Sequence, residues 1–86
     1  DSGYAFNSQG FISNIITVDA TGGKIEEEWG YDWCLNLDNV NFYVKPETGK
    51  NLKSLTVNGA DYTGKVKDGK FTVLCRGDIN INATFE

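Results

Sequence analysis

Hydrophobic and polar residues alternate along most of this chain, with the two-residue period of a β-strand that buries one face. The C-terminal segment 79–85 shows this pattern most clearly, because every second residue in it is apolar. We expect the apolar side chains of this segment to be buried: Ile79, Ile81, Ala83 and Phe85. The residues between them are expected to face solvent: Asn80, Asn82 and Thr84.

The same alternation recurs in several short segments that are separated by turn residues. The predicted strands are 15–20, 31–37, 40–44, 53–57, 62–66, 71–75 and 79–86. Leu52 is out of phase with Leu55 and Val57, which indicates a bulge near Ser54. Because the connections are short, neighbouring strands should be mostly antiparallel. The pattern predicts an all-β fold, a small antiparallel two-layer β-sandwich or rolled sheet of roughly five to eight short strands.

Two dipeptides and one atypical segment refine this prediction. Asn58-Gly59 and Asp68-Gly69 lie between alternating segments and predict tight hairpin turns with positive φ at both residues. Segment 24–29 has a helical composition, although it is too short to hold a helix alone. One helical turn around Glu26 would favour a β-grasp-like fold, which is the alternative to the sandwich.

Length and charge limit the domain organisation and the partners. The 86 residues make one domain. Residues 1–14 are a polar lead-in, where a short edge strand near Phe11 is an open alternative, and residues 15–86 form a single β module. The net charge of −4 disfavours nucleic acid, which is bound by clustered Lys and Arg. No apolar run is long enough to cross a bilayer, so direct membrane insertion is not expected.

The two cysteines, Cys34 and Cys75, allow one disulfide. Cys75 shares a face with Phe71 and Val73, which is the expected inner face. Cys34 alternates against Trp33 and its neighbours, so the pattern can place it on the opposite face. Two buried thiols that act as small apolar side chains therefore stay open as the other interpretation.

Groups that carry catalysis or bind metals are scarce. The chain has no histidine, which excludes Ser-His and Cys-His chemistry within it. Asp32 with Asp38, or the carboxylates of 26–28, could supply oxygens to calcium, but the spacing of a calcium loop is absent. A solvated acidic edge that discourages strand aggregation is the simpler interpretation. We expect no enzyme activity, no metal and no cofactor.

Five residues near the acidic stretch are candidates for ligand binding: Glu28, Trp29, Tyr31, Asp32 and Trp33. Exposed aromatic rings can stack on sugar rings while neighbouring carboxylates accept hydrogen bonds from hydroxyl groups. Alternation places Tyr31 and Trp33 in the core, where large aromatics commonly dominate. Trp29 precedes the strand and lies among glutamates, so it is the one expected to be exposed.

The order of several motifs resembles the divergent internalin B-repeats of bacterial surface proteins. The matching stretches are Val40–Lys50, Leu52–Gly59 with Asp61, Gly77–Glu86, and Ile16-Thr17-Val18 followed by Gly22-Gly23. Together they cover roughly 15–86. The stretch 26–33 is longer than the turn that the family has at this place, and 1–14 has no counterpart.

The resemblance implies a tandem β module of a secreted or surface-bound bacterial protein, located outside the cell beside other domains of a larger chain. Such modules act as spacers or adhesive units and are not catalysts. We therefore expect a non-catalytic extracellular module whose partner is unknown, a host glycan or a matrix protein being the candidates. The competing hypothesis is a carbohydrate-binding accessory domain that uses exposed aromatics near Trp29.

Overall fold

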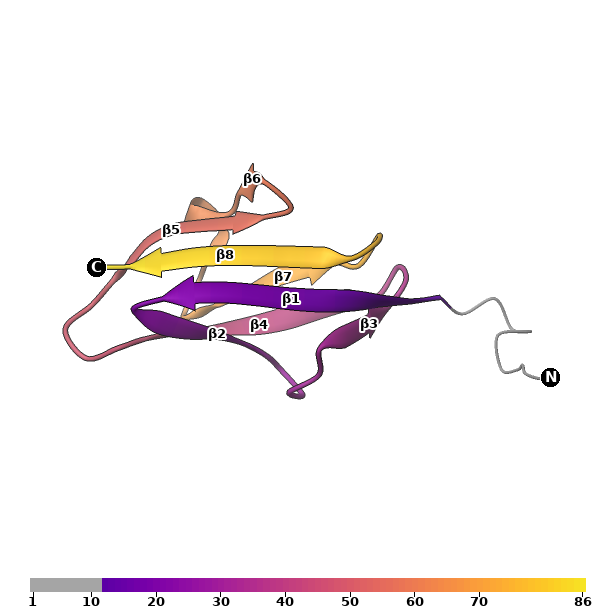
Figure 1. Ribbon diagram of the computed structural model, residues 1–86, viewed down its shortest axis with the longest axis horizontal. Coiled ribbons are helices and arrows are strands. Elements are labelled where there is room, and N and C mark those ends of the chain that lie inside the picture. Colours follow the sequence, from indigo (N-terminus) through magenta and orange to yellow (C-terminus); the bar gives the residue numbers. More distant parts are fainter. Residues whose placement is uncertain (1–11) are drawn as a thin grey trace.

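The computed structural model describes residues 12–86 and forms two packed β-sheets (Figure 1). The strands are β1 (Ser13–Thr21), β2 (Gly23–Glu27), β3 (Trp33–Leu35), β4 (Asn39–Pro46), β5 (Leu52–Val57), β6 (Ala60–Asp61), β7 (Lys70–Leu74) and β8 (Ile79–Phe85). One sheet has the order β3-β1-β8-β5-β6 and the other β2-β4-β7. The predicted all-β, two-layer fold is confirmed.

The chain passes from one sheet to the other between β1 and β2. Gly22 has a φ of +81°, and a Cβ atom there would lie 2.5 Å from the carbonyl oxygen of Phe85. Only glycine combines this left-handed backbone with so close an approach. The glycine break is therefore what lets one continuous segment contribute to both layers.

The segment around Glu26 is a strand, so the alternative of one helical turn there, with its β-grasp-like fold, is wrong. Its alternation is short but regular: Ile25 is buried, while Lys24 and Glu26 are exposed. Pairing of β2 with β4 places Glu26 opposite Tyr43. These tertiary contacts override the helical composition, and residues 12–86 contain no α-helix that would support a β-grasp fold.

One strand pair departs from the expected antiparallel order. β1 and β8 are parallel, with Ile16 opposite Ile79 and Thr21 opposite Thr84. Figure 1 shows the two arrows side by side and pointing the same way. The remaining pairs are antiparallel, as predicted. Parallel pairing is possible here because the whole chain between β1 and β8 forms the crossover.

The core lies between the two sheets. The four apolar residues predicted on β8 are all buried in it. The buried apolar residues of the core are Ile16, Ile25, Cys34, Val40, Phe42, Leu55, Val57, Phe71, Val73, Cys75, Ile79, Ile81, Ala83 and Phe85. Asn80 and Asn82 are exposed, and Thr84 is half-buried. Phe42 and Phe71 stack across β4 and β7 with their ring centres 5.2 Å apart.

Both predicted hairpin turns are present. Positive φ angles occur at Asn58 (51°) and Gly59 (83°), and at Asp68 (54°) and Gly69 (76°). The predicted bulge is also observed, since the pairing register of β5 with β8 shifts between Leu52 and Ser54. A two-residue turn between antiparallel strands needs a left-handed backbone at both central residues. Asn-Gly and Asp-Gly are the dipeptides that adopt it most readily.

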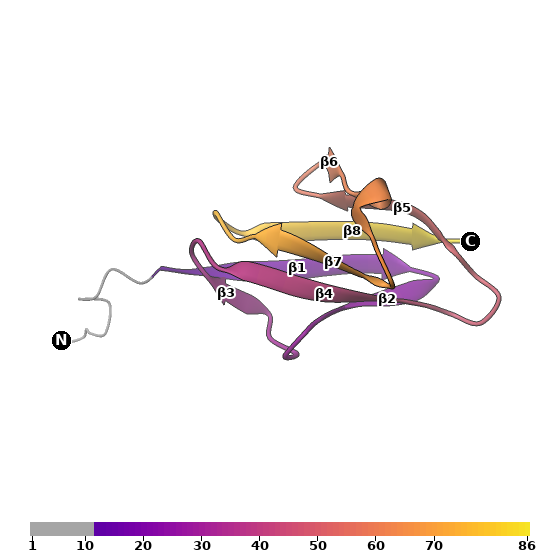
Figure 2. The same ribbon diagram turned by 180° about the vertical axis from the view of Figure 1, so that it is seen from behind.

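Several boundaries differ from the prediction, and the predicted strand 31–37 is observed only as β3 (Trp33–Leu35). Segment 62–66 is not a strand, because β6 ends at Asp61 and the 3₁₀ turn η2 (Thr63–Lys65) follows beside β5 (Figure 2). The Thr63 hydroxyl oxygen accepts a hydrogen bond from the Leu55 amide at 2.9 Å, which favours the turn. β1 begins two residues before the predicted module boundary at 15. The expected strand near Phe11 lies outside the described residues.

Candidate functional site

The connection from β2 to β3 is held by the carboxylate of Glu27. Its Oε1 accepts hydrogen bonds from the backbone amides of Trp29 and Tyr31, both at 2.8 Å. Gly30 has a φ of +79° and donates its amide to the Glu27 carbonyl oxygen at 3.0 Å. Glu27 therefore stabilises this turn, a role that differs from the solvated acidic edge expected for 26–28.

Three aromatic side chains emerge from this connection into solvent. Trp29 is 71% exposed, Tyr31 is 51% exposed and Trp33 is 42% exposed. Tyr31 and Trp33 stack with their ring centres 5.1 Å apart, and we call this pair the aromatic stack. The exposure predicted for Trp29 is confirmed, whereas the prediction that Tyr31 and Trp33 belong to the core is wrong.

Cys34 explains why the aromatic stack faces outward. Cys34 is buried and forms a disulfide with Cys75, with the two Cα atoms 6.4 Å apart. Successive side chains of a strand point to opposite faces, so an inward Cys34 places Trp33 outward. The disulfide is present although the pattern left it open, and the possibility that Cys34 faces away from Cys75 is wrong.

Backbone contacts hold β3 and the turn that follows it. β3 pairs with β1, where Trp33 lies opposite Ile15, itself an exposed apolar residue. Beyond β3, the amide of Cys75 donates to the carbonyl of Asp38 at 2.8 Å. These contacts and the disulfide hold the edge of the sheet that carries the aromatic stack.

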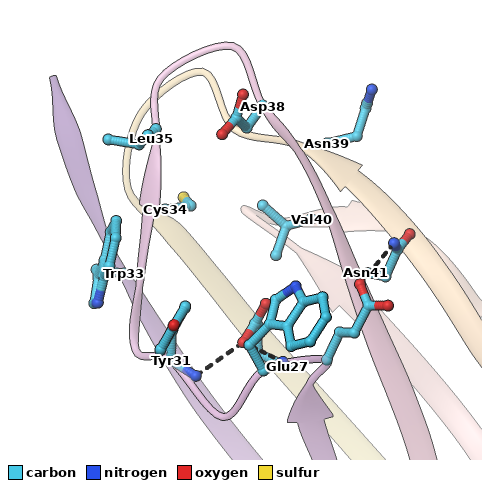
Figure 3. A pocket seen from close by; sticks show the side chains of 11 residues that line it. Glu27, Tyr31, Trp33, Cys34, Leu35, Asp38, Asn39, Val40 and Asn41 are labelled. Atoms are coloured by element: carbon cyan, nitrogen blue, oxygen red, sulfur yellow. Dashed lines mark hydrogen bonds between the residues drawn. The ribbon is translucent and has the colours of Figure 1, made fainter. Parts of the chain in front are cut away.

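A groove of about 170 Å³ opens between β3 and β4, and we call it the aromatic groove. It is lined by Glu27, Glu28, Trp29, Tyr31, Trp33, Cys34, Leu35, Asp38, Asn39, Val40 and Asn41. Figure 3 shows Cys34 and Val40 pointing into it, while the side chains of Trp33 and Leu35 point away. The stack therefore lies on the outer face of β3, beside an apolar floor.

Polar groups form one wall of the aromatic groove. Asn41 donates its Nδ2 to Glu28 Oε1 at 3.0 Å, and its Oδ1 accepts a hydrogen bond from the Thr72 hydroxyl at 2.6 Å. This network fixes which way the Asn41 amide points and leaves Glu28 with further acceptor capacity. An apolar floor with a few oriented polar groups is the usual composition of a small-ligand site.

Four of the five predicted ligand residues line this groove, and Asp32 does not. Asp32 lies on the far side of the connection, in a depression formed with Val18 and Ile25, and its backbone oxygen binds the Ile16 amide at 2.8 Å. Sequence reasoning missed Val40 and Asn41, because their strand was interpreted only as core. The only sequence signal for the outward position of Asn41 was its polar side chain between the apolar residues Val40 and Phe42.

Glu26, on β2, forms a salt bridge with Lys45 on β4. The pKa of Glu26 is lowered because the Lys45 ammonium, at 2.8 Å, donates a hydrogen bond and adds a positive charge. Both groups lie on the outer face of the β2–β4 pair and not in the aromatic groove. Within residues 12–86, no group of three or more His, Cys, Asp or Glu side chains is arranged to hold a metal ion.

Comparison of the chain with protein-family models, with curated proteins and with solved structures gave no match. Among the described residues, no helix has the length and apolar character needed to cross a membrane.

Proposed function

We propose that this chain is a non-catalytic adhesive module of a bacterial surface or secreted protein, and that it binds carbohydrate at the aromatic groove and the aromatic stack. The observation that carries the proposal is the exposure of three aromatic side chains, Trp29 and Tyr31 on the β2–β3 connection and Trp33 at the start of β3. Burying such rings is the ordinary way to stabilise a small domain. When the three rings stay in solvent, the domain gains no stability from burying them. A bound ligand would cover the rings and provide this burial.

The chemistry of the site suits sugars. The C–H faces of a sugar ring are apolar and can lie flat on an indole or phenol ring. The hydroxyl groups around the ring need acceptors and donors, which Glu28 and Asn41 offer at the groove wall. Tyrosine and tryptophan are also the residues that give large contact area at low cost in side-chain entropy.

The extracellular location rests on the disulfide and on the resemblance to surface repeats. Disulfides persist in oxidising compartments and are rare in the bacterial cytosol. The Cys34–Cys75 bond closes a long loop across the core, so it is a structural link. A spacer would need the disulfide but would not need the exposed rings, which is why we favour the adhesive role.

A glycan array tests the proposal against the spacer hypothesis. The expected result is reproducible binding that is lost in Trp29→Ala and in Trp33→Ala. Leu74→Ala is the matched control, because Leu74 is 42% exposed, as Trp33 is, but does not line the groove. Absence of binding to all glycans and matrix proteins would favour the spacer hypothesis, provided that circular dichroism shows all variants to be folded.

A further inference from the structure

A second surface depression adjoins the aromatic groove, and we call it the lysine groove. It is lined by Glu28, Asn41, Tyr43, Lys65, Lys67, Asp68, Lys70, Phe71 and Thr72. Glu28 and Asn41 line both depressions and are hydrogen-bonded to each other. The two grooves therefore meet along one shared wall, and a single extended ligand can occupy both.

The lysines of this groove differ from three other lysines of the chain. Lys45, Lys50 and Lys53 each make a salt bridge with a glutamate. Lys65, Lys67 and Lys70 are exposed and make no salt bridge with any residue of 12–86. The ammonium groups of Lys67 and Lys70 are thus available to an external anion, and Lys65 Nζ, which lies 5.5 Å from the centre of the Tyr62 ring, has no acidic partner within residues 12–86.

The hairpin turn between η2 and β7 forces two of these charges together. Lys67 and Lys70 exchange backbone hydrogen bonds of 2.9 and 3.1 Å, so they are directly opposite residues of the hairpin. Side chains of such a pair lie on the same face, and like charges there are destabilising. A bound anion would relieve this repulsion.

We infer that the carbohydrate bound by this module is an acidic polysaccharide. Its carboxylate or sulfate groups contact Lys65, Lys67 and Lys70, and its sugar rings lie along the aromatic groove and stack. Tyr43 and Thr72 also line the lysine groove and add hydroxyl groups to it. The inference rests on the proposed function, which it extends from carbohydrate in general to one charge class.

The molecule as a whole is acidic, and its overall charge therefore repels a polyanion. The net charge is −4, and Glu28 and Asp68 also line the lysine groove, so a polyanion gains nothing from the overall field. Binding must depend on the local lysines. Exposed charges are screened over about 8 Å at physiological salt, so the affinity should fall as salt is added.

The test compares charged and neutral forms of one polymer. Polygalacturonate with its methyl ester tests carboxylate, and dextran sulfate with dextran tests sulfate; dissociation constants are measured by calorimetry on the folded chain. We expect the wild type to prefer a charged form, and Lys67→Gln with Lys70→Gln to lose roughly tenfold in affinity for it. Lys50→Gln with Lys53→Gln removes the same charge outside the groove and should change little.

The outcomes separate this inference from the proposed function. Equal binding of charged and neutral polymers, lost in Trp33→Ala, would overturn the acidic-ligand inference and leave the carbohydrate site. Charged-polymer binding that depends on the lysines but not on Trp29 or Trp33 would support the lysine groove and overturn the aromatic site. Equal binding of an oligonucleotide of matched charge would overturn the inference, because the surface would then recognise charge alone. No binding to any polymer would overturn both.

Discussion

Strand β8 and the segment 31–37 have the same alternating pattern of apolar residues, but their large apolar side chains face opposite ways: inward on β8 and toward solvent in 31–37. On β8, each apolar residue packs inward, and Ile79 and Ile81 are almost completely buried. In 31–37 the aromatic residues Tyr31 and Trp33 face solvent, and Cys34, which follows Trp33, is the buried residue. Alternation shows that a strand has two different faces, but the face that becomes covered depends on the strand's neighbours.

Position within the sheet accounts for the difference. β8 lies between β1 and β5, and the three-stranded sheet covers its inner face. β3 is a three-residue strand at the edge, and its inner position is small and linked to Cys75. A large ring at an edge gains less from burial than at the centre, since fewer atoms surround it.

Truncating Phe85 should produce the largest effect. Phe85 is 2% exposed and packs beneath Gly22 and Gly23 at the crossing between the sheets. Phe85→Ala removes its contacts and leaves a cavity, so we expect the free energy of unfolding in urea to fall by about 3–5 kcal/mol. A loss below about 1 kcal/mol, as at surface sites, would contradict the central packing of β8.

Removing the disulfide should be nearly as costly. The bond joins residues 41 positions apart, and opening that loop costs about 4 kcal/mol in the chain-entropy model. Cys34→Ala with Cys75→Ala is compared with the oxidised wild type by denaturant unfolding, after mass spectrometry has confirmed the oxidation state. Equal stability of the two proteins would show that β3 is held without the bond.

A smaller effect is expected at the hairpin turns. Gly59 and Gly69 have positive φ, where a Cβ atom is crowded, so Val at either position should cost about 1–2 kcal/mol. Gly64→Val is the matched control, since Gly64 lacks positive φ and a Cβ there meets open space. Thermal melting measures the difference. Loss of carbohydrate affinity with unchanged melting in Gly59→Val would instead place that turn, which lines neither groove, in a binding surface.

The smallest effect on stability is expected at the aromatic stack. Trp33→Ala removes an exposed ring with one stacking partner, so the loss should stay below about 1 kcal/mol. The comparison with Phe85→Ala is direct, because both truncate an aromatic residue of an alternating strand. A loss of about 3 kcal/mol or more would restore the core role that alternation predicted for Trp33.

Local pattern was sufficient for several elements of this protein. Segment 79–85, the positive φ of Asn58 and Asp68, and the bulge before Leu55 all followed from the sequence and are confirmed. Each depends on neighbours within a few residues, where period, turn chemistry and sterics act directly. The exposure of Trp29 belongs to this group, because no strand pattern surrounds it.

Only the tertiary structure decided the rest. The outward stack of Tyr31 and Trp33 depends on the bond between Cys34 and Cys75, which are far apart in the sequence. The groove wall needs Asn41 of β4 to meet Glu28, and β2 (Gly23–Glu27) needs β4 as its partner. Contacts between distant segments determine which face is covered and which strands pair, and periodicity within one segment holds no information about them.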